Sequence, residues 1–368
     1  MKMHSMKVCH ISSLHPAKDH RIYFKECVSL AKQGFDTHLI LCNREASNEF
    51  GVQVHNLTFK YSDRLNRIKK ALTYCLTKAI ELDADIYHLH DPELLLLAKQ
   101  LKKRGKVVIY DAHEDVPIQM LNKAYIPKAF RKTAAAVYKQ FEARICRKLD
   151  ACLVASPSMI ERFESYTKTI GIFNFPQWRR ANEVAWSERE QAICYIGTLT
   201  ETRGIYDILE SIRDLDVKFY LAGNWHEPSF EKKCRAHPSW NKVEFLGYID
   251  QEKIYEILGK VKAGLSMLHP LPNYVRAYTG KMFEYMAAGV PVIVSDFDLW
   301  KGLLDQTNCG ISCTPKDHKA LKEAIQELLT NEKNASLLGS NGKSAAKSDF
   351  CWESEEQKLI ALYNSFQR

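Results

Sequence analysis

The stretch Tyr278-Thr-Gly-Lys-Met-Phe-Glu-Tyr-Met-Ala-Ala-Gly-Val-Pro-Val-Ile-Val-Ser295 reads as a loop, a short helix and a buried strand in immediate succession. Lys281 and Glu284 are three residues apart, so on a helix they share one face. Gly289 and Pro291 end the helix, and the apolar run around them is typical of a strand in a parallel sheet. A helix N-terminus that carries a lysine attracts phosphate groups, and a carboxylate one turn later can accept hydrogen bonds from a ribose. The stretch therefore predicts an α/β fold that holds a nucleoside diphosphate.

Strands and helices alternate on both sides of this stretch, which is the pattern of parallel α/β sheets. In the first half, the predicted strands begin at Lys7, Thr37, Asp85, Lys106 and Ala151, and the predicted helices cover 21–33, 92–104 and 127–149. In the second half, the predicted strands begin at Ala192, Val217, Val243, Ala263 and Val290, and the predicted helices cover 206–214, 253–258, 316–329 and 352–366. The two halves repeat one architecture.

A chain of 368 residues is long enough for two domains. The segment between Phe173 and Glu190 resembles a linker, because it is polar and contains a proline. We expect an N-terminal domain over 1–178, a C-terminal domain over 179–348 and a C-terminal helix over 349–368 that packs back on the N-terminal domain. Parallel sheets bind ligands at the carboxyl ends of their strands, so the cleft between the domains is the expected site.

The composition is that of a soluble globular protein, with 46% hydrophobic and 26% charged residues. No run of 18 apolar residues predicts a transmembrane helix, and the first residues lack the apolar stretch of a signal peptide. The eleven cysteines are scattered and form no C-x-x-C motif, which favours reduced thiols. These features predict a cytoplasmic protein.

The charge is divided unevenly. Residues 1–180 hold 30 Lys+Arg and 18 Asp+Glu, a net charge of +12, whereas residues 181–368 hold 22 and 26, a net charge of −4. The basic stretches 60–78 and 123–148 interleave cations with aromatic and aliphatic residues. Such stretches form either a solvated helix face or a face that lies on anionic lipid. No nucleic-acid-binding module accompanies them.

Several segments together resemble a known family. Gly197-Thr-Leu-Thr-Glu-Thr-Arg-Gly204, Leu221-Ala-Gly223, Val243-Glu-Phe-Leu-Gly247 and the stretch from Lys281 to Ile293 follow one another as in retaining GT-B glycosyltransferases of family 4. The segment from Asp19 to Gly34 resembles its counterpart in capsule and O-antigen members. The resemblance spans nearly the whole chain, and it implies two Rossmann-like parallel-sheet domains that face a central cleft.

The resemblance also implies an activity. Family members transfer a sugar from a nucleoside-diphosphate sugar to a hydroxyl of a glycan, with retention of anomeric configuration. Here it implies a UDP-sugar or, as a second choice, a GDP-sugar, and a lipid-linked acceptor in bacterial surface polysaccharide synthesis. It implies no metal and no cofactor apart from the donor, and it is compatible with work at the inner face of the cell membrane.

Matching positions take the family's roles. Arg203 and Lys281 would contact the donor diphosphate, Glu284 would hold the ribose, and His113 would face the donor sugar and the acceptor. The remaining donor-binding positions are Gly197, Thr198, Gly223, Asn224, Gly247, Tyr248, Ile249, Thr279 and Gly280. The positions assigned to the acceptor or the cleft are Asp19, Arg21, His90 and Glu114.

Two positions depart from the family pattern. Thr198 stands where the family usually has an arginine, and Arg276 stands where it usually has the first of two glutamates. The departures leave the contacts to the donor sugar open.

Several of these residues also have an ordinary structural interpretation. Lys281 and Glu284 could form a surface ion pair. Asp19 and Arg21 could start a helix, and Asp91 before Pro92 could be an N-cap, with His90 beside it. Asp83 and Asp85 precede a strand, which is the wrong end for a metal site in the expected cleft.

Two other functions fit the same layout. One is a nucleotide-sugar 2-epimerase, which needs no acceptor. The other is a nucleotide-sugar-binding protein without catalysis, suggested by Thr198 and Arg276. A dehydrogenase is disfavoured, because no G-x-G-x-x-G motif follows the first strand.

Overall fold

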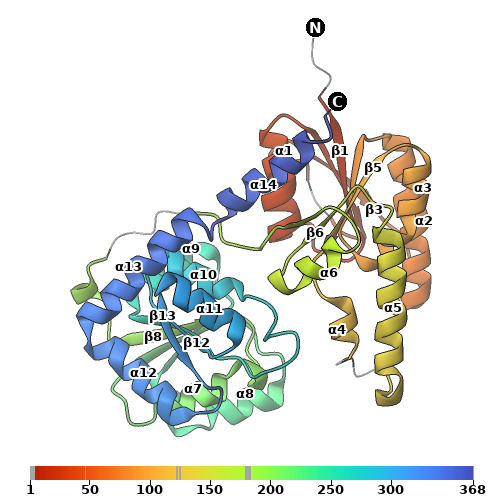
Figure 1. The fold of residues 1–368 in the computed structure, drawn as a ribbon. Helices are drawn as coiled ribbons and strands as arrows, with labels where there is room; N and C mark the ends of the chain where they lie inside the picture. Colours follow the sequence, from red (N-terminus) through yellow and green to blue (C-terminus); the bar gives the residue numbers. More distant parts are fainter. Residues whose placement is uncertain (1–4, 46, 122, 124–125, 179–183, 368) are drawn as a thin grey trace. The chain divides into compact units, whose positions relative to one another are not determined.

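Figure 1 shows the fold in a computed structural model that describes residues 5–45, 47–121, 123, 126–178 and 184–367. The chain forms two compact α/β units. Unit 1 consists of Met1–Asn174 and Glu355–Arg368, and unit 2 consists of Phe175–Ser354. The predicted boundary at 178/179 borders residues 179–183, which lie outside the described residues, and the division in the structure falls after Asn174.

Unit 1 is built on a seven-stranded parallel sheet with the order β3-β2-β1-β4-β5-β6-β7. The strands are β1 (Lys7–Ser12), β2 (Asp36–Cys42), β3 (Val52–Leu57), β4 (Ile86–Leu89), β5 (Val107–Ala112), β6 (Ala151–Val154) and β7 (Thr169–Gly171). The inner strands are continuous apolar runs, because both faces of a parallel sheet are covered. The predictions of β1, β2, β4, β5 and β6 are confirmed, whereas the sequence did not reveal β3 and β7.

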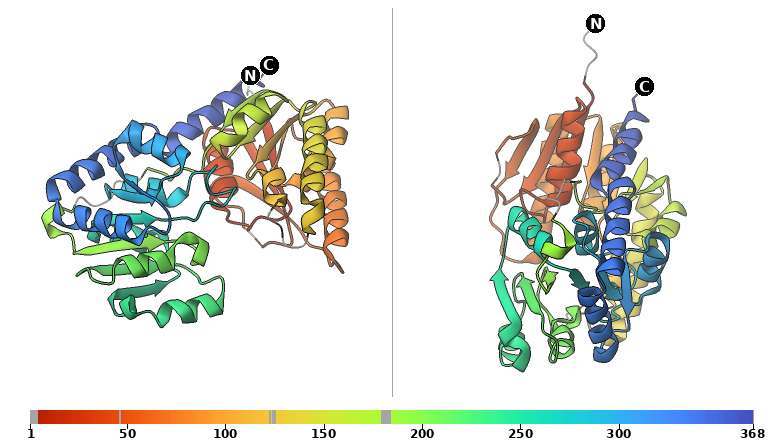
Figure 2. Two further views of the ribbon diagram at one scale, coloured as in Figure 1. Left: turned by 60° about the horizontal axis from the view of Figure 1, so that its bottom comes forward. Right: turned by 90° about the vertical axis from the view of Figure 1, so that its left-hand side faces the viewer.

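The helical elements of unit 1 follow its strands. They are η1 (His20–Cys27), α1 (Val28–Lys32), α2 (Arg64–Leu82), η2 (Pro92–Leu94), α3 (Leu95–Lys103), α4 (Val116–Met120), η3 (Lys128–Phe130), α5 (Arg131–Cys146), η4 (Pro157–Met159) and α6 (Ile160–Glu164). The main apolar core joins α2 and α3 to the sheet. Helix α14 (Trp352–Asn364) begins in unit 2 and ends in unit 1, beside α1 in Figures 1 and 2.

The segment predicted as one helix over 21–33 is π-helical in its first half, η1. The carboxylate of Asp19 accepts hydrogen bonds from the backbone N–H groups of Arg21 at 2.8 Å and Ile22 at 2.9 Å. Asp19 is therefore an N-cap, as its ordinary structural interpretation proposed. The π-helical turn places the side chains of both Arg21 and Glu26 in the interior of unit 1.

Unit 2 is built on a six-stranded parallel sheet with the order β10-β9-β8-β11-β12-β13. Its strands are β8 (Ala192–Ile196), β9 (Lys218–Ala222), β10 (Val243–Gly247), β11 (Ala263–Ser266), β12 (Val292–Ser295) and β13 (Gly310–Cys313). Its helical elements are η5 (Trp186–Glu188), η6 (Glu201–Arg203), α7 (Ile205–Ser211), α8 (Pro228–Arg235), η7 (Pro238–Lys242), α9 (Gln251–Lys260), α10 (Gly280–Ala287), α11 (Asp298–Thr307), α12 (His318–Thr330) and α13 (Glu332–Ser348). The sequence did not reveal β13, α8, α11 or α13.

All eleven cysteines lie in the described part of the chain, where they are buried and form no disulfide. Within the same residues, no helix has the length and apolar character needed to span a bilayer.

The loop after β8 lies directly against the end of β11. Gly204 has a φ of +73°, and a Cβ built at this position would lie 2.0 Å from the carbonyl oxygen of Met267. Only glycine allows both this conformation and this approach. The contact fixes the position of Arg203, the residue before it.

We expect Gly204→Ala to destabilise unit 2 by about 2–4 kcal/mol, because it adds a backbone overlap to an unfavourable φ. All six tryptophans lie in unit 2, so urea unfolding followed by tryptophan fluorescence reports on this unit alone. Gly302→Ala is the matched control. It lies inside α11, where a Cβ added to the glycine would meet no other atom within 4 Å, and alanine should stabilise the helix by about 0.5–1 kcal/mol. Equal stabilities of the two variants would contradict the structural reason for Gly204.

Candidate functional site

The connections of unit 2 reverse direction between β8 and β11. The chain passes from β8 to β9 and β10 on one side, and then to β11, β12 and β13 on the other side. The loops that follow β8 and β11 therefore leave neighbouring strand ends in opposite directions. Such a switch point opens a crevice for a ligand in α/β sheets.

Three glycines mark the carboxyl ends of β8, β9 and β10. The N–H of Gly197 donates to Ala222 O at 2.9 Å, and the N–H of Gly223 donates to Gly247 O at 2.7 Å. A Cβ at Gly223 would lie 1.8 Å from Gly197 O, so no side chain fits there. The strand ends therefore present backbone groups rather than side chains, as a closely bound phosphate requires.

Lys281 lies in the first turn of α10 and has only 8% of its surface exposed. Its Nζ lies 3.7 Å from the centre of the Tyr195 ring and has no hydrogen-bond partner. Gly197 lies against the same ammonium group, because a Cβ built there would be 3.2 Å from Nζ. Burial lowers the pKa of Lys281 well below its usual range, the charge of Arg203 lowers it further, and Glu284 partly offsets both. A buried amine in this state gains strongly from a bound anion.

Arg203 reaches the same region from the loop after β8. Its guanidinium lies 5.9 Å from the centre of the Tyr274 ring. Burial works against the charge of Arg203, but the hydroxyl groups of Tyr195 and Tyr274 outweigh it and raise the pKa of the guanidinium. The charges of Arg203 and Lys281 therefore repel each other, and an anion bound by both side chains would relieve this repulsion.

The N-terminus of α10 adds backbone donors to the two cations. Thr279 is the N-cap residue, but its hydroxyl pairs with that of Ser266 at 3.1 Å and does not cap the helix. Gly280 is exposed at the first helical position, and Glu284 is half-buried one turn later. The alternative of an exposed surface pair of Lys281 and Glu284 is wrong, because the ammonium group of Lys281 is buried.

The other predicted donor positions line the same strand ends. Thr198 and Asn224 are exposed, and their carbonyl groups accept hydrogen bonds from Tyr195 Oη at 3.0 Å and Leu199 N at 2.9 Å. Tyr248 follows Gly247 and is 77% exposed, and Ile249 beside it is half-buried. The structure thus gathers the predicted donor-binding residues in unit 2.

The remaining predicted residues form a second group around Asp111 in unit 1. Arg21 binds both carboxylate oxygens of Asp111, at 2.9 and 2.8 Å, and also donates to Ile172 O at 2.7 Å. His113 Nε2 lies 2.9 Å from Asp111 Oδ2. Burial alone would raise the pKa of Asp111, but the charge of Arg21 and the hydrogen bond of His113 hold it well below its usual range. Arg21 and Asp111 therefore orient His113, the most accessible member of the group.

Two predicted positions in unit 1 differ from expectation. Asp91 precedes η2 but does not cap it. Its carboxylate instead accepts from Ser13 N at 2.6 Å and Ser12 Oγ at 3.0 Å, and it lies 3.1 Å from His15 Nδ1. The N-cap interpretation is wrong because the loop after β1 offers closer donors. His90 is only 1% exposed, so we assign it a supporting role in the interior of unit 1 rather than direct contact with a ligand.

Glu114 is exposed and accepts a hydrogen bond from Gln119. Asp83 ends α2 and pairs with Lys106 at 2.7 Å, and Asp85 accepts from Lys7 N at 2.8 Å. Asp83 and Asp85 therefore have structural roles, as expected from their position before β4.

Sequence reasoning missed three residues that lie beside His90. His10 on β1, His88 on β4 and Glu26 on η1 are all buried against one another. The available signal was the pair His88-x-His90, because residues two apart in a strand face the same side of a sheet.

Two family models match the chain: residues 25–169 match the model of Glycosyltransferase Family 4, and residues 176–345 match that of Glycosyl transferases group 1. Glycogen synthase from Mycobacterium tuberculosis is 21% identical over 182 residues, which are 48% of this chain and 43% of that protein. The chain thus matches less than half the length of this relative.

Alpha-galactosylglucosyldiacylglycerol synthase from Streptococcus pneumoniae is 21% identical over 316 residues, which are 79% of each chain. The structure of Anabaena HepE in complex with UDP and glucose has a TM-score of 0.72 at 12% identity, and the match covers 98% of this chain and 100% of that chain. The predicted fold of two Rossmann-like parallel-sheet domains is confirmed. The chain therefore has the GT-B fold, and its two halves match the models of Glycosyltransferase Family 4 and Glycosyl transferases group 1.

Proposed function

We propose that this chain transfers a sugar from a nucleoside-diphosphate sugar to a hydroxyl group of a glycan. The observation that carries the proposal is the buried ammonium group of Lys281, which has no hydrogen-bond partner and lies at the switch point of unit 2. Its desolvation is unfavourable in the free protein. A diphosphate would supply both the missing acceptor and the missing charge.

In this proposal, each part of the donor would contact a different group in unit 2. Lys281, Arg203 and the N-terminus of α10 would bind the diphosphate, and Glu284 would accept hydrogen bonds from the ribose hydroxyls. The exposed ring of Tyr248 and the backbone of Gly247 would meet the base. As the glycosidic bond breaks, negative charge grows on the leaving diphosphate, and the two cations would stabilise it where other enzymes use a metal.

Two relatives and one sequence segment support finer proposals about the donor, the acceptor and the biological role. HepE was solved with UDP and glucose, which supports UDP-sugar as the donor class, with GDP-sugar as the second choice. The diacylglycerol synthase relative supports a lipid-linked acceptor. The segment from Asp19 to Gly34, with its resemblance to capsule and O-antigen members, supports a place in surface polysaccharide synthesis.

In unit 1, His113 is the residue that we propose to contact the reacting sugars. Asp111 and Arg21 hold its ring, and with Nε2 engaged its Nδ1 remains to position a hydroxyl. We propose a retaining reaction in which a donor phosphate oxygen takes the acceptor proton, so His113 positions the sugars and forms no covalent bond. The anomeric configuration of the product, read by NMR, tests this step.

We expect Lys281→Met to lower transfer at least about 100-fold, as the loss of one charge-stabilising donor does in other enzymes. The same change should stabilise the free protein by about 1–3 kcal/mol, because it removes a buried donor that lacks a partner. Release of nucleoside diphosphate and urea unfolding by tryptophan fluorescence measure the two effects. Lys301→Met, at an exposed position on α11, should change neither.

The gain in folding stability of Lys281→Met over the wild type should depend on pH. The pKa of Lys281 in the folded protein lies below its ordinary value of about 10.4, so the cost of burying it is complete below the folded-state pKa. As the pH rises toward the ordinary value, the amine becomes neutral in both states and the cost disappears. The difference between Lys281→Met and the wild type should therefore narrow at alkaline pH. A variant that is less stable than the wild type at neutral pH would contradict the assignment.

A panel of donors separates the proposed function from its alternatives. Thermal shifts with UDP, GDP, ADP and their sugars identify the base, because a bound ligand raises apparent stability by mass action. Incubation with the donor alone then tests for a 2-epimerase, which would convert the sugar without an acceptor. Binding without turnover across all donors and acceptors would support a binding protein instead.

The basic surface of unit 1 supports contact with a membrane. On α5, Lys139 is exposed together with Val137, which is 65% exposed, as is Phe130 just before the helix. Residues 124–125, within the predicted basic stretch 123–148, lie outside the described residues. Exposed apolar side chains among cations fit the interface of an anionic bilayer, so we propose that the protein works at the cytoplasmic face of the membrane.

We expect the double variant Phe130→Ser/Val137→Ser to bind phosphatidylglycerol vesicles at least about 10-fold more weakly than the wild type, because it loses two apolar groups that the bilayer would bury. Co-sedimentation measures the affinity. Leu337→Ser, which alters a residue 53% exposed on α13 of unit 2, serves as the control and should bind normally. Equal binding of the wild type to phosphatidylcholine vesicles would rule out an anionic surface as the partner.

A further inference from the structure

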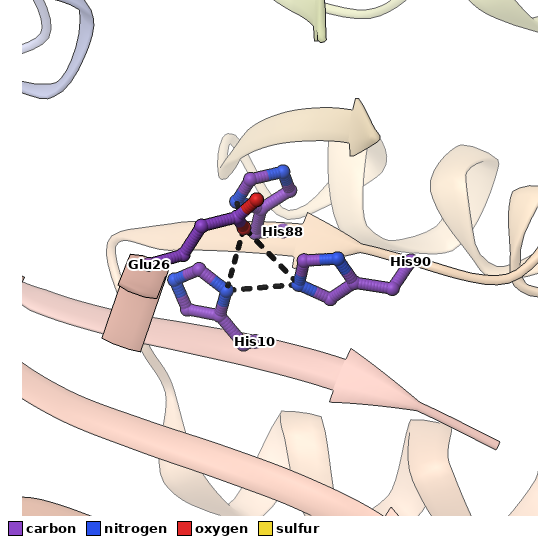
Figure 3. A group of neighbouring side chains, drawn as sticks. All are labelled: His10, Glu26, His88 and His90. Atoms are coloured by element: carbon purple, nitrogen blue, oxygen red, sulfur yellow. Dashed lines mark hydrogen bonds and ion pairs between the residues drawn. The ribbon is translucent and has the colours of Figure 1, made fainter. Parts of the chain in front are cut away.

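Three histidines and one glutamate meet in the interior of unit 1, as Figure 3 shows. His10 lies on β1, His88 lies on β4 with His90 directly after it, and Glu26 lies on η1. His10 is the direct register partner of His88, and His90 lies two residues further along the chain. All four residues are at most 1% exposed. None of them belongs to the donor site in unit 2.

Two of the proposed ligand atoms, His10 Nδ1 and His90 Nε2, share a hydrogen bond of 2.9 Å, whereas Glu26 lies further from all three histidines (Figure 3). Glu26 Oε2 lies 3.9 Å from each of His10 Nδ1, His88 Nδ1 and His90 Nε2. These distances are too long for hydrogen bonds. Four atoms around a tetrahedral zinc ion are separated by roughly 3.4 Å, given bonds of about 2.0–2.1 Å. Small side-chain movements that separate the nitrogens of His10 and His90 and draw Glu26 inward would therefore bring all four atoms to a common ion.

Glu26 has a charged partner on one side only. Both of its oxygens are buried without a hydrogen bond, although Arg21 Nε lies 3.0 Å from Oε1 as an ion pair. Nearly all buried polar atoms in proteins are satisfied, so each exception requires an explanation. An ion on the Oε2 side would supply the missing interaction and leave Arg21 on the Oε1 side.

One of the histidines is backed by a carboxylate, as ligands in metal sites often are. His90 Nδ1 lies 3.4 Å from Asp111 Oδ2, which leaves Nε2 of the same ring for the ion. A carboxylate on the far nitrogen fixes the ring and its tautomer in metal sites.

We propose that His10, Glu26, His88 and His90 bind one divalent transition-metal ion, with zinc as the best match. Four protein ligands leave no open position, so the ion has a structural role that joins β1, η1 and the end of β4. The neighbouring group of His90, Asp111 and His113 is a weaker candidate, because Arg21 already occupies both oxygens of Asp111. The sequence predicted no metal, and the proposal departs from that prediction.

Metal content and metal titration of the whole protein test the proposal directly. After removal of bound ions with a chelator, the wild type should take up one Zn²⁺ per chain, with a rise in melting temperature and release of protons. Co²⁺ should bind in its place and give the visible absorption of a tetrahedral site. A wild type that takes up neither ion and shows no thermal shift would overturn the proposal.

Variants separate a metal site from a hydrogen-bonded histidine cluster. Glu26→Gln should weaken Zn²⁺ binding at least about 10-fold, since even the loss of a group that only holds a ligand in place does so. His55→Gln is the matched control, because His55 pairs with His38 at 2.9 Å in the same unit but with no carboxylate ligand from η1. It should bind Zn²⁺ normally, and equal losses in both variants would contradict the proposed ligands.

Tyr363→Phe gives a result that a folding defect cannot imitate. Tyr363 Oη lies 2.8 Å from His88 Nδ1 and competes with the ion for that nitrogen. The variant should therefore bind Zn²⁺ at least as tightly as the wild type. A lower affinity in a folded Tyr363→Phe protein would show that the phenol, not an ion, completes the cluster.

Discussion

Parallel pairing forces all strands of a sheet to end on the same edge, and both units depend on this constraint. In unit 1 the order changes direction at β1 and β4, and in unit 2 it changes at β8 and β11. Loops that leave these strand ends bring together residues far apart in the sequence, such as Arg203 with Lys281 and Arg21 with Asp111. The candidate functional residues of each unit therefore lie at the strand ends where the strand order changes direction.

The sequence predicted the inner strands well and the edge strands poorly. An inner strand such as β1 or β8 is buried on both faces and forms one apolar run, which is visible without an alignment. β3, β7 and β13 lie at sheet edges and are partly exposed, so no such run appears. Three of the four edge strands were missed for this reason, and only β10 was found.

Site residues within a local sequence motif could be predicted, whereas residues that meet only through strand pairing could not. Lys281 was found because a helix start and a buried strand flank it. Its burial and its missing partner could not be predicted, since they depend on Tyr195 and Gly197 across the sheet. For Asp91 the local pattern was misleading. Its position before Pro92 predicted an N-cap, but its carboxylate accepts a hydrogen bond from the loop after β1 instead. The contacts of His10, Glu26 and His88 required the pairing of β1 with β4, which no local pattern contains.

The return of the chain to unit 1 at Glu355 has a consequence for its synthesis. The phenol of Tyr363 and the carboxylate of Glu355 are both buried in unit 1, although the whole of unit 2 separates them from the rest of unit 1 in the sequence. Domains usually fold in the order in which they leave the ribosome, with the N-terminal domain first. Here the N-terminal unit stays incomplete until the segment from Glu355 onward is released, so unit 2 is the first to have its whole sequence. The order of maturation is thereby the reverse of the order of translation.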